Sequence, residues 1–260
     1  NRSPSVSSVS ISPTSPNSTQ VLTCSHSATD PDGESLTASY EWFVNGPSVG
    51  LSNTLDLGAI GVTPFDLVEC VVTVSDAAGA SDSLTSNTTV SNTDPTVDVL
   101  TLTPAEPTLN DTLSCYAEAS DLDGDTPTLS FDFTNQTTGS AYTPTSSSTN
   151  LATLDISTTS SNYDDVFTCT VTAEDAQGAV VSSSTSVTIV NTSPVFDQGA
   201  VISPSVVEIG TTATCSAVAS DPDDGVASLS YIWQVNGAQV AIGSSWLVNS
   251  TDASVGDSLT

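Results

Sequence analysis

One pattern occurs three times in this chain, and each occurrence is anchored by a cysteine. In every copy an aromatic residue follows that cysteine by eighteen positions. The pairs are Cys24 and Trp42, Cys115 and Phe133, and Cys215 and Trp233. Matching segments, NRSP, NTDP and NTSP, begin at positions 1, 92 and 191, so the periods are 91 and 99 residues. A period of this length is the size of a domain, which predicts three tandem domains over residues 1–91, 92–190 and 191–260.

Apolar and polar residues alternate in short runs through each copy, and turn residues separate the runs. This pattern is typical of an all-β sandwich. The last two strands of the first copy form a hairpin through Asp76–Gly79, and the second copy repeats that hairpin through Asp175–Gly178. In the first copy we expect one weaker strand in the middle and six clear strands near residues 5–12, 19–27, 38–45, 54–58, 67–75 and 82–90.

The strands that carry the cysteines and aromatic residues resemble a known family. The stretches DPDGESLTASYEWFVNG (Asp30–Gly46) and VECVVTVSDAAGAS (Val68–Ser81) are similar to phrases of tandem immunoglobulin-like repeats in bacterial cell-surface proteins, of the PKD-type and cadherin-like kinds. The resemblance covers the whole chain. It implies an all-β fold of tandem immunoglobulin-like β-sandwiches, each with an inter-sheet disulfide, in a bacterial extracellular surface or fibre protein. The chain departs from the family pattern at Phe133, where a tryptophan is usual, and at Val68 and Phe167, where a tyrosine is usual.

The resemblance pairs the cysteines as Cys24–Cys70 and Cys115–Cys169. Because disulfides of this kind persist outside the cytosol, we expect a secreted protein at the cell surface. The 46-residue spacing of the first pair would put the partner of Cys215 at position 261. We therefore expect that the third domain is cut before its last strands and that Cys215 bonds a residue beyond the chain end. Two alternatives stay open: a bond between two chains through Cys215, and five buried cysteines that are all reduced.

The chain is strongly acidic. It has 30 acidic residues and a formal net charge of −29, and Arg2 is its single basic residue besides one histidine. Such a chain repels nucleic acid and anionic lipid, so we expect neither as a partner, and cations are the natural counter-species. No apolar run approaches the length of a transmembrane helix, so we expect no membrane insertion within this segment.

Aspartates gather after the first cysteine of each copy and in the predicted hairpins. An immunoglobulin-like sandwich brings these loops to one end of the domain, and clustered carboxylates suit calcium, which takes six to eight oxygen ligands. In cadherin-like proteins calcium at the junctions stiffens the string of domains, and the resemblance implies the same use here. The alternative is that Asp-Pro-Asp-Gly is an ordinary turn. The candidate calcium ligands are Asp30, Asp32, Asp76, Asp94, Asp121, Asp123, Asp125, Asp175, Asp221, Asp223 and Asp224.

The residue types needed for catalysis are scarce. His26 is the single histidine, and its counterparts in the other copies are Ala117 and Ala217, so we expect it at the end of a core strand. The sequence has no nucleophile elbow, phosphate-binding loop or zinc-ligand cluster, which predicts that the protein is not an enzyme. If the producing cell glycosylates, the candidate acceptors are Asn1, Asn17, Asn87, Asn110, Asn135, Asn191 and Asn249.

The leading hypothesis is a non-enzymatic extracellular structural protein, the repeat unit of a cell-surface stalk or self-assembling filament. Its partners would be further copies of itself or further immunoglobulin-like repeats of the same chain, with calcium as the possible cofactor. The alternative is an adhesin module that binds a glycan or another cell surface. Such a module needs an aromatic platform, for which Trp246 is the candidate, but its alignment with Leu55 and Leu154 predicts that it points into the core.

Overall fold

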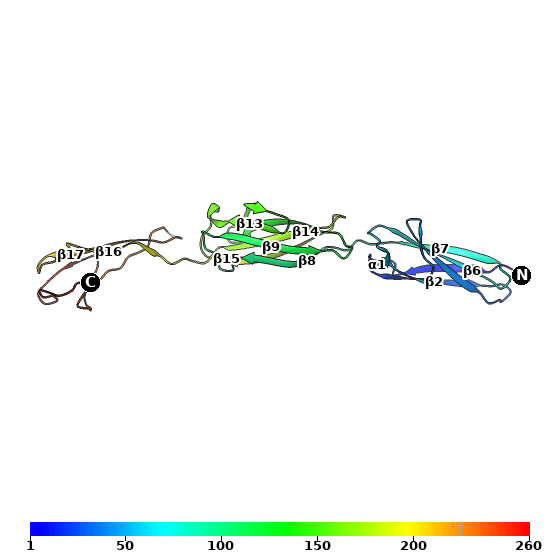
Figure 1. Cartoon of the computed structure of the whole chain (residues 1–260), viewed down its shortest axis with the longest axis horizontal. Coiled ribbons are helices and arrows are strands. Elements are labelled where there is room, and N and C mark those ends of the chain that lie inside the picture. Colours follow the sequence, from blue (N-terminus) through cyan, green and yellow to red (C-terminus); the bar gives the residue numbers. More distant parts are fainter. Residues whose placement is uncertain (224) are drawn as a thin grey trace.

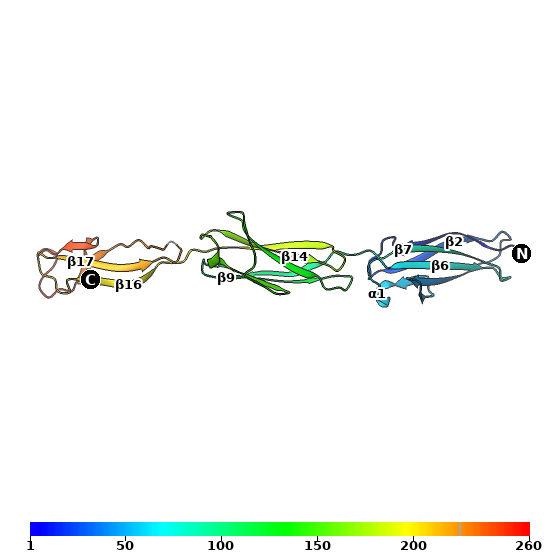
Figure 2. The same cartoon turned by 90° about the horizontal axis from the view of Figure 1, so that it is seen from above.

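Three bodies built of β-strands follow one another along the chain. The structure is a computed structural model that describes residues 1–223 and 225–260. The bodies lie end to end, and the row is extended both in the first view and after a 90° turn about its long axis (Figures 1 and 2). Buried apolar side chains form a separate cluster in each body. Within the described part of the chain, no helix combines the length and the apolar character that crossing a membrane requires.

The first sandwich has seven strands and one short helix. Its two antiparallel sheets have the strand orders β1-β2-β5 and β4-β3-β6-β7. The six clear strands expected from the sequence are all present, with ends shifted by at most a few residues, and β4 is the weaker strand. The elements are β1 (Ser5–Ser12), β2 (Val21–Thr29), β3 (Thr37–Val44), β4 (Ser48–Gly50), β5 (Thr54–Asp56), α1 (Leu57–Ile60), β6 (Leu67–Ser75) and β7 (Ser81–Thr89).

The second sandwich repeats this arrangement and adds one strand. Its sheets have the orders β12-β13-β9-β8 and β11-β10-β14-β15, again antiparallel. In both sandwiches the last two strands form the predicted hairpin, and Gly79 and Gly178 take the positive φ that its turn requires. The elements are β8 (Thr96–Thr103), β9 (Thr112–Ser120), β10 (Thr128–Asn135), β11 (Ser140–Tyr142), β12 (Ser146–Ser147), β13 (Leu151–Asp155), the 3-10 turn Ile156–Thr158, β14 (Val166–Glu174) and β15 (Val180–Thr188).

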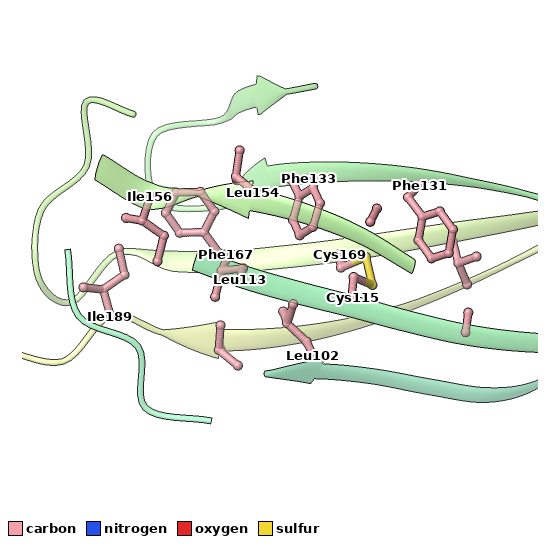
Figure 3. Close-up of a cluster of buried hydrophobic side chains, with 14 residues drawn as sticks. Leu102, Leu113, Cys115, Phe131, Phe133, Leu154, Ile156, Phe167, Cys169 and Ile189 are labelled. Atoms are coloured by element: carbon pink, nitrogen blue, oxygen red, sulfur yellow. A yellow bond between two sulfur atoms is a disulfide. The ribbon is translucent and has the colours of Figure 1, made fainter. Parts of the chain in front are cut away.

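A disulfide joins the two sheets of each complete sandwich, as predicted. Cys24 of β2 bonds Cys70 of β6, and Cys115 of β9 bonds Cys169 of β14, with S–S distances of 2.07 and 2.03 Å. Phe133 is fully buried against the second disulfide, and Phe131 lies on the other side of it (Figure 3). The fold is therefore all-β. It consists of tandem immunoglobulin-like sandwiches, and a disulfide links the two sheets of the first and of the second sandwich.

The third body repeats the first five strands of the first sandwich. Its sheets are β16-β17-β20 and β18-β19, and the counterparts of β6 and β7 are missing from its described residues. Trp246 of β20 is 8% exposed and its ring lies 6.0 Å from that of Trp233, so the prediction that it points into the core is confirmed. The strands are β16 (Val195–Ser203), β17 (Thr212–Ser220), β18 (Ile232–Val235), β19 (Ala238–Ile242) and β20 (Ser245–Leu247).

Candidate metal centres

An acidic cluster lies at the leading end of the first sandwich. It combines the loop after β2, which carries Asp30 and Glu34, with the β6–β7 turn, which carries Asp76. One carboxylate oxygen from each of these three residues lies within 4.8 Å of the other two. Hard cations such as calcium bind oxygen ligands grouped in this way.

The same aspartates also build the turns on which they sit. Asp30 Oδ1 accepts hydrogen bonds from the backbone N–H groups of Asp32, at 2.7 Å, and Glu34, at 3.4 Å. Asp76 Oδ1 accepts from Ala78 and Ala80, both at 2.9 Å. Asp30 Oδ2 is buried and has no hydrogen-bond donor among the described residues. The turn and the candidate cation site are therefore compatible, because they use different oxygens of Asp30.

The second sandwich carries a corresponding cluster, which we call the second acidic cluster: Asn92, Asp121, Asp125 and Asp175. Asp121 Oδ1 accepts from the backbone of Asp123 at 2.7 Å. Three further oxygens are buried and lack a donor among the described residues. They are Asp121 Oδ2, Asp125 Oδ1 and Asn92 Oδ1. Buried acceptors without donors are rare in folded proteins, and ordered water or a bound ion usually satisfies them.

The electrostatics of the second acidic cluster point the same way. Burial raises the pKa of Asp121, and the nearby charges of Asp125, Asp123 and Asp175 raise that pKa further. The pKa of Asp175 is instead lowered, first by the amide of Asn92 and then by backbone N–H groups of its turn. Like charges held together in this way favour a bound counter-charge.

In each body, the aspartate two positions after Asp30, Asp121 or Asp221 has a different role, which sequence reasoning missed. It holds the segment that leads into its own body, and this hydrogen bond recurs in all three bodies. The pairs are Asp32 with the backbone N–H of Arg2 at 2.6 Å, Asp123 with that of Thr93 at 2.7 Å, and Asp223 with the hydroxyl of Thr192 at 2.8 Å. In the first body the Arg2 side chain adds an ion pair with Asp32 at 2.8 Å. We call this contact the linker clamp.

The predicted ligands differ in the contacts that they make in the structure. Asp32 and Asp123 accept hydrogen bonds in the linker clamp, and Asp94 is exposed on the connecting segment, and all three stay predictions as calcium ligands. Asp221 accepts from the backbone of Asp223 at 2.9 Å, as Asp30 and Asp121 do in their turns. Asp224 lies outside the described residues.

Sequence reasoning also missed three members of the clusters. Asn1 and Asn92 reach the hairpin aspartates through their side-chain amides, and Glu34 occupies the place that Asp125 has in the second copy. The signal was available. Asn begins each of the matching segments at 1, 92 and 191, and Glu34 aligns with Asp125 when the copies are matched on cysteine.

One glycosylation candidate is wrong. Asn135 is fully buried and its amide nitrogen donates to Asp165 Oδ2 at 2.8 Å, so a glycan there is incompatible with the folded sandwich. The other six candidates stay predictions. The amides of Asn1 and Asn249 donate to Asp76 and Asp252. Asn17 is half-buried, and Asn87, Asn110 and Asn191 are exposed.

His26 has a structural environment. It lies half-buried on β2, its Nδ1 is 3.0 Å from the hydroxyl of Tyr40, and the two rings meet edge to face. An imidazole that contacts a phenol at the edge of a hydrophobic core is typical of a residue with a packing role.

Comparisons with known proteins give fold likenesses only. No family model matches the chain, and no curated protein matches it either. Among solved structures, the chain is similar to immunoglobulin domains 1–5 of Sidekick-1, with 16% identity and a TM-score of 0.36 over 94% of this chain and 49% of that one. The chain thus spans about half the length of that structure.

Two bacterial structures are also similar to this chain, with identities and TM-scores in the same low range. Fibronectin(III)-like modules of Clostridium thermocellum CbhA match at 15% identity and a TM-score of 0.30, over 70% of this chain and 94% of that one. A Ca²⁺-stabilised adhesin with which an Antarctic bacterium binds ice matches at 18% identity and a TM-score of 0.36, over 98% and 65%. Likenesses this loose carry no conclusion about function.

Proposed function

We propose that the chain is part of a non-enzymatic extracellular structural protein, in which immunoglobulin-like domains form a stalk or a self-assembling filament. The end-to-end row of sandwiches in Figure 1 supports this function, because domains arranged in this way span a long distance for the number of residues they contain. Two inter-sheet disulfides support a location outside the cytosol. The domain boundaries at 91/92 and 190/191 are part of this proposal.

Calcium is the proposed stiffening agent. The observation that carries this step is the set of buried acceptor oxygens that lack donors among the described residues. In the second acidic cluster these oxygens come from the loop after β9 and from Asn92, which belongs to the segment leading into the sandwich. A cation bound there would tie that segment to the sandwich body. In the first sandwich Asp30, Glu34, Asp76 and Asn1 would do the same.

The charge of the protein gives the cation a further effect. Each sandwich carries a large excess of acidic residues, so neighbouring sandwiches repel one another. A divalent cation at the leading end of a sandwich lowers that repulsion where two sandwiches meet. Water and backbone carbonyls would complete the six to eight ligands that calcium takes.

Calorimetry on the full chain tests the calcium proposal. Titration with CaCl2 should give saturable binding with a Kd of about 10⁻⁴–10⁻³ M, the range of extracellular modules, and MgCl2 should bind less tightly. Asp121→Asn together with Asp125→Asn should remove one class of sites. The matched control, Asp132→Asn, removes an exposed carboxylate of β10 that is not a candidate ligand, and this variant should bind as the parent does. Equal binding by all three proteins would rule out the second acidic cluster.

The structural role has a separate test. Electron microscopy of the native material should show rods or filaments with a fixed axial spacing. Isolated particles that adhere to glycan arrays would instead favour the adhesin alternative. That alternative gets no support from Trp246, since its side chain is buried in the third body.

A further inference from the structure

Three peptide bonds of the chain join an aspartate to a proline. They are Asp30–Pro31, Asp94–Pro95 and Asp221–Pro222. Such a bond can be broken by its own aspartate, because the side chain can close a five-membered ring on the adjacent backbone carbonyl carbon. The proline nitrogen is then the leaving group, and it departs as a secondary amine. Whether the ring can close depends on how the surrounding fold holds the aspartate.

In the first body the fold holds Asp30 in a turn that opposes this ring closure. Its Oδ1 accepts from the backbone N–H of Asp32 at 2.7 Å, and its backbone oxygen accepts from the N–H of Gly33 at 3.1 Å. The second carboxylate oxygen of Asp30 is buried. To reach its own carbonyl carbon, the side chain has to give up the hydrogen bonds that build the turn.

The third body repeats this turn around Asp221. The carboxylate accepts from the backbone N–H of Asp223 at 2.9 Å, and the backbone oxygen accepts from the N–H of Gly225 at 2.7 Å. In the loops after β2 and β17, the carboxylate and the carbonyl of the aspartate are therefore both engaged with other groups. These two Asp-Pro bonds serve as internal references for the third.

The Asp94–Pro95 bond lies in the segment between the first two sandwiches, and its aspartate is not held in a turn. Asp94 is exposed, and neither its carboxylate nor its backbone oxygen has a hydrogen-bond or ion-pair partner among the described residues. The backbone is fixed on both sides of it. Thr93 donates its N–H to Asp123 in the linker clamp, and β8 begins at Thr96. A free side chain on a fixed backbone favours the approach of the two reacting groups.

The matching segments of the other bodies lack this chemistry. NRSP and NTSP carry Ser3 and Ser193 at the position where NTDP carries Asp94. A serine offers no carboxylate that could close the ring. Of the three leading segments, the one between the first two sandwiches alone combines an exposed aspartate with a following proline.

We propose that Asp94–Pro95 is a site of self-cleavage that separates the first sandwich from the rest of the chain. A carboxylate oxygen of Asp94 attacks its own backbone carbonyl carbon, and a C–O bond forms. The C–N bond to Pro95 breaks, and the proline nitrogen keeps the electron pair and takes a proton from solvent. Water then opens the cyclic anhydride, so that Asp94 ends the first fragment with two carboxyl groups and Pro95 begins the second with a free amine.

The net reaction is the hydrolysis of one peptide bond, and water is its single co-reactant. This inference goes beyond the proposed function, since the cut would shorten a stalk, a filament or an adhesin alike. It is also separate from the candidate metal centres, because no ion takes part in the reaction.

Incubation of the full chain in acetate buffer at pH 4 and 37 °C tests the site. Circular dichroism verifies that the chain stays folded, and mass spectrometry after denaturation gives the extent of cleavage at each Asp-Pro bond. We expect residues 1–94 and 95–260 as the main products, with cleavage after Asp94 at least about tenfold faster than after Asp30 or Asp221. In urea with the disulfides reduced, the turns are lost and the three rates should become similar.

Two variants test the role of the side chain. Asp94→Ser gives this segment the residue found in NRSP and NTSP and should abolish the cut, because the nucleophile is absent. Asp94→Glu keeps the charge but has to form a larger ring, so cleavage should slow by at least about tenfold. The control, Asp98→Asn, removes an exposed carboxylate of β8, and this variant should be cleaved as the parent is.

Three results would overturn the proposal. Equal cleavage at the three bonds of the folded chain would mean that the fold does not select Asp94. An undiminished cut after residue 94 in Asp94→Ser would assign the cleavage to a contaminating protease. An intact folded chain, under conditions that cleave all three bonds in urea, would mean that the fold protects Asp94–Pro95 as well.

Discussion

The side-chain amide of Asn92 donates to Asp175 Oδ2 at 2.7 Å, and Asn1 stands in the same relation to Asp76 at 2.9 Å. In each case a residue of the leading segment contacts a hairpin turn more than seventy residues away in sequence. The other amide atom of Asn92, Oδ1, is buried and has no donor among the described residues. The Asn92 side chain therefore fixes the connecting segment with its nitrogen, and its oxygen remains available as an acceptor.

Asn92→Ala should loosen the connection between the first two sandwiches. The variant loses both the hydrogen bond to Asp175 and one candidate calcium ligand, so calcium affinity should fall and the pKa of Asp175 should rise toward its usual value. Calorimetry and carboxylate NMR titration measure the two effects. Asn110→Ala, at an exposed position of the same sandwich, is the control. Unchanged affinity in Asn92→Ala would exclude its oxygen as a ligand.

Asp121→Asn should change stability in opposite directions with and without calcium. Without calcium the substitution removes a carboxylate whose pKa is raised by burial and by neighbouring charges, so the second sandwich should become more stable. The gain should be roughly half a kcal/mol or less, because water screens this partly exposed site. With calcium the variant lacks a ligand and should be less stable than the parent. Thermal unfolding in EDTA and in CaCl2 measures both signs, and a gain under both conditions would contradict a cation site at Asp121.

Acid should weaken the complete sandwiches through their hairpin turns. The folded-state pKa values of Asp76 and Asp175 are lowered, first by the amides of Asn1 and Asn92 and then by turn N–H groups. A lowered folded pKa contributes stability above the unfolded value of about 3.9, and this stability is lost as pH falls through the folded pKa. Unfolding in urea between pH 6 and pH 2 should show that loss, and Asp175→Asn should flatten it for the second sandwich. A parent and variant with identical pH profiles would contradict this role.

The fold could be predicted because local patterns determine it. Two sequence features placed Cys24, Trp42 and Cys70 on the correct strands and faces. One is the spacing from cysteine to aromatic residue, and the other is the alternation of apolar and polar residues along each strand. These features depend on alternation within a strand, which a single sequence displays directly. The hairpin turns were equally readable, because Asp and Gly at fixed spacing specify the turn.

The site could be predicted only in part, because its members come from three separate segments. Sequence reasoning grouped Asp30, Asp32 and Asp76 as candidate ligands, and it did not predict that Asp32 contacts Arg2. Neighbouring aspartates in one loop point in different directions, and the direction depends on where the leading segment passes. Arg2 forms a hydrogen bond and an ion pair with Asp32, and the sequence alone does not show that these two residues are in contact.

Removal of one disulfide should destabilise one sandwich alone. Cys115→Ala with Cys169→Ala opens a loop of 54 residues and should cost the second sandwich about 3–4 kcal/mol on the chain-entropy estimate. Replacing both cysteines avoids a stray thiol. Differential scanning calorimetry should show one transition moving down while that of the first sandwich, with its own bond between Cys24 and Cys70, stays in place. A joint shift of both transitions would mean that the sandwiches unfold as one unit.

Ser18 should control bending at the first junction. Its hydroxyl, on the first sandwich, donates to Asp123 Oδ1 of the second at 2.6 Å, and the side chain is 6% exposed. The corresponding residue toward the third body is Leu109, which packs against the core of the second sandwich instead. Ser18→Ala therefore removes a cross-junction bond that the second junction cannot form through this position. Small-angle scattering should report a shorter mean end-to-end length and a broader distribution for Ser18→Ala, with the exposed neighbour variant Thr19→Ala unchanged. Identical scattering from both variants would mean that the linker clamp between Asp123 and Thr93 holds the first junction without help from Ser18.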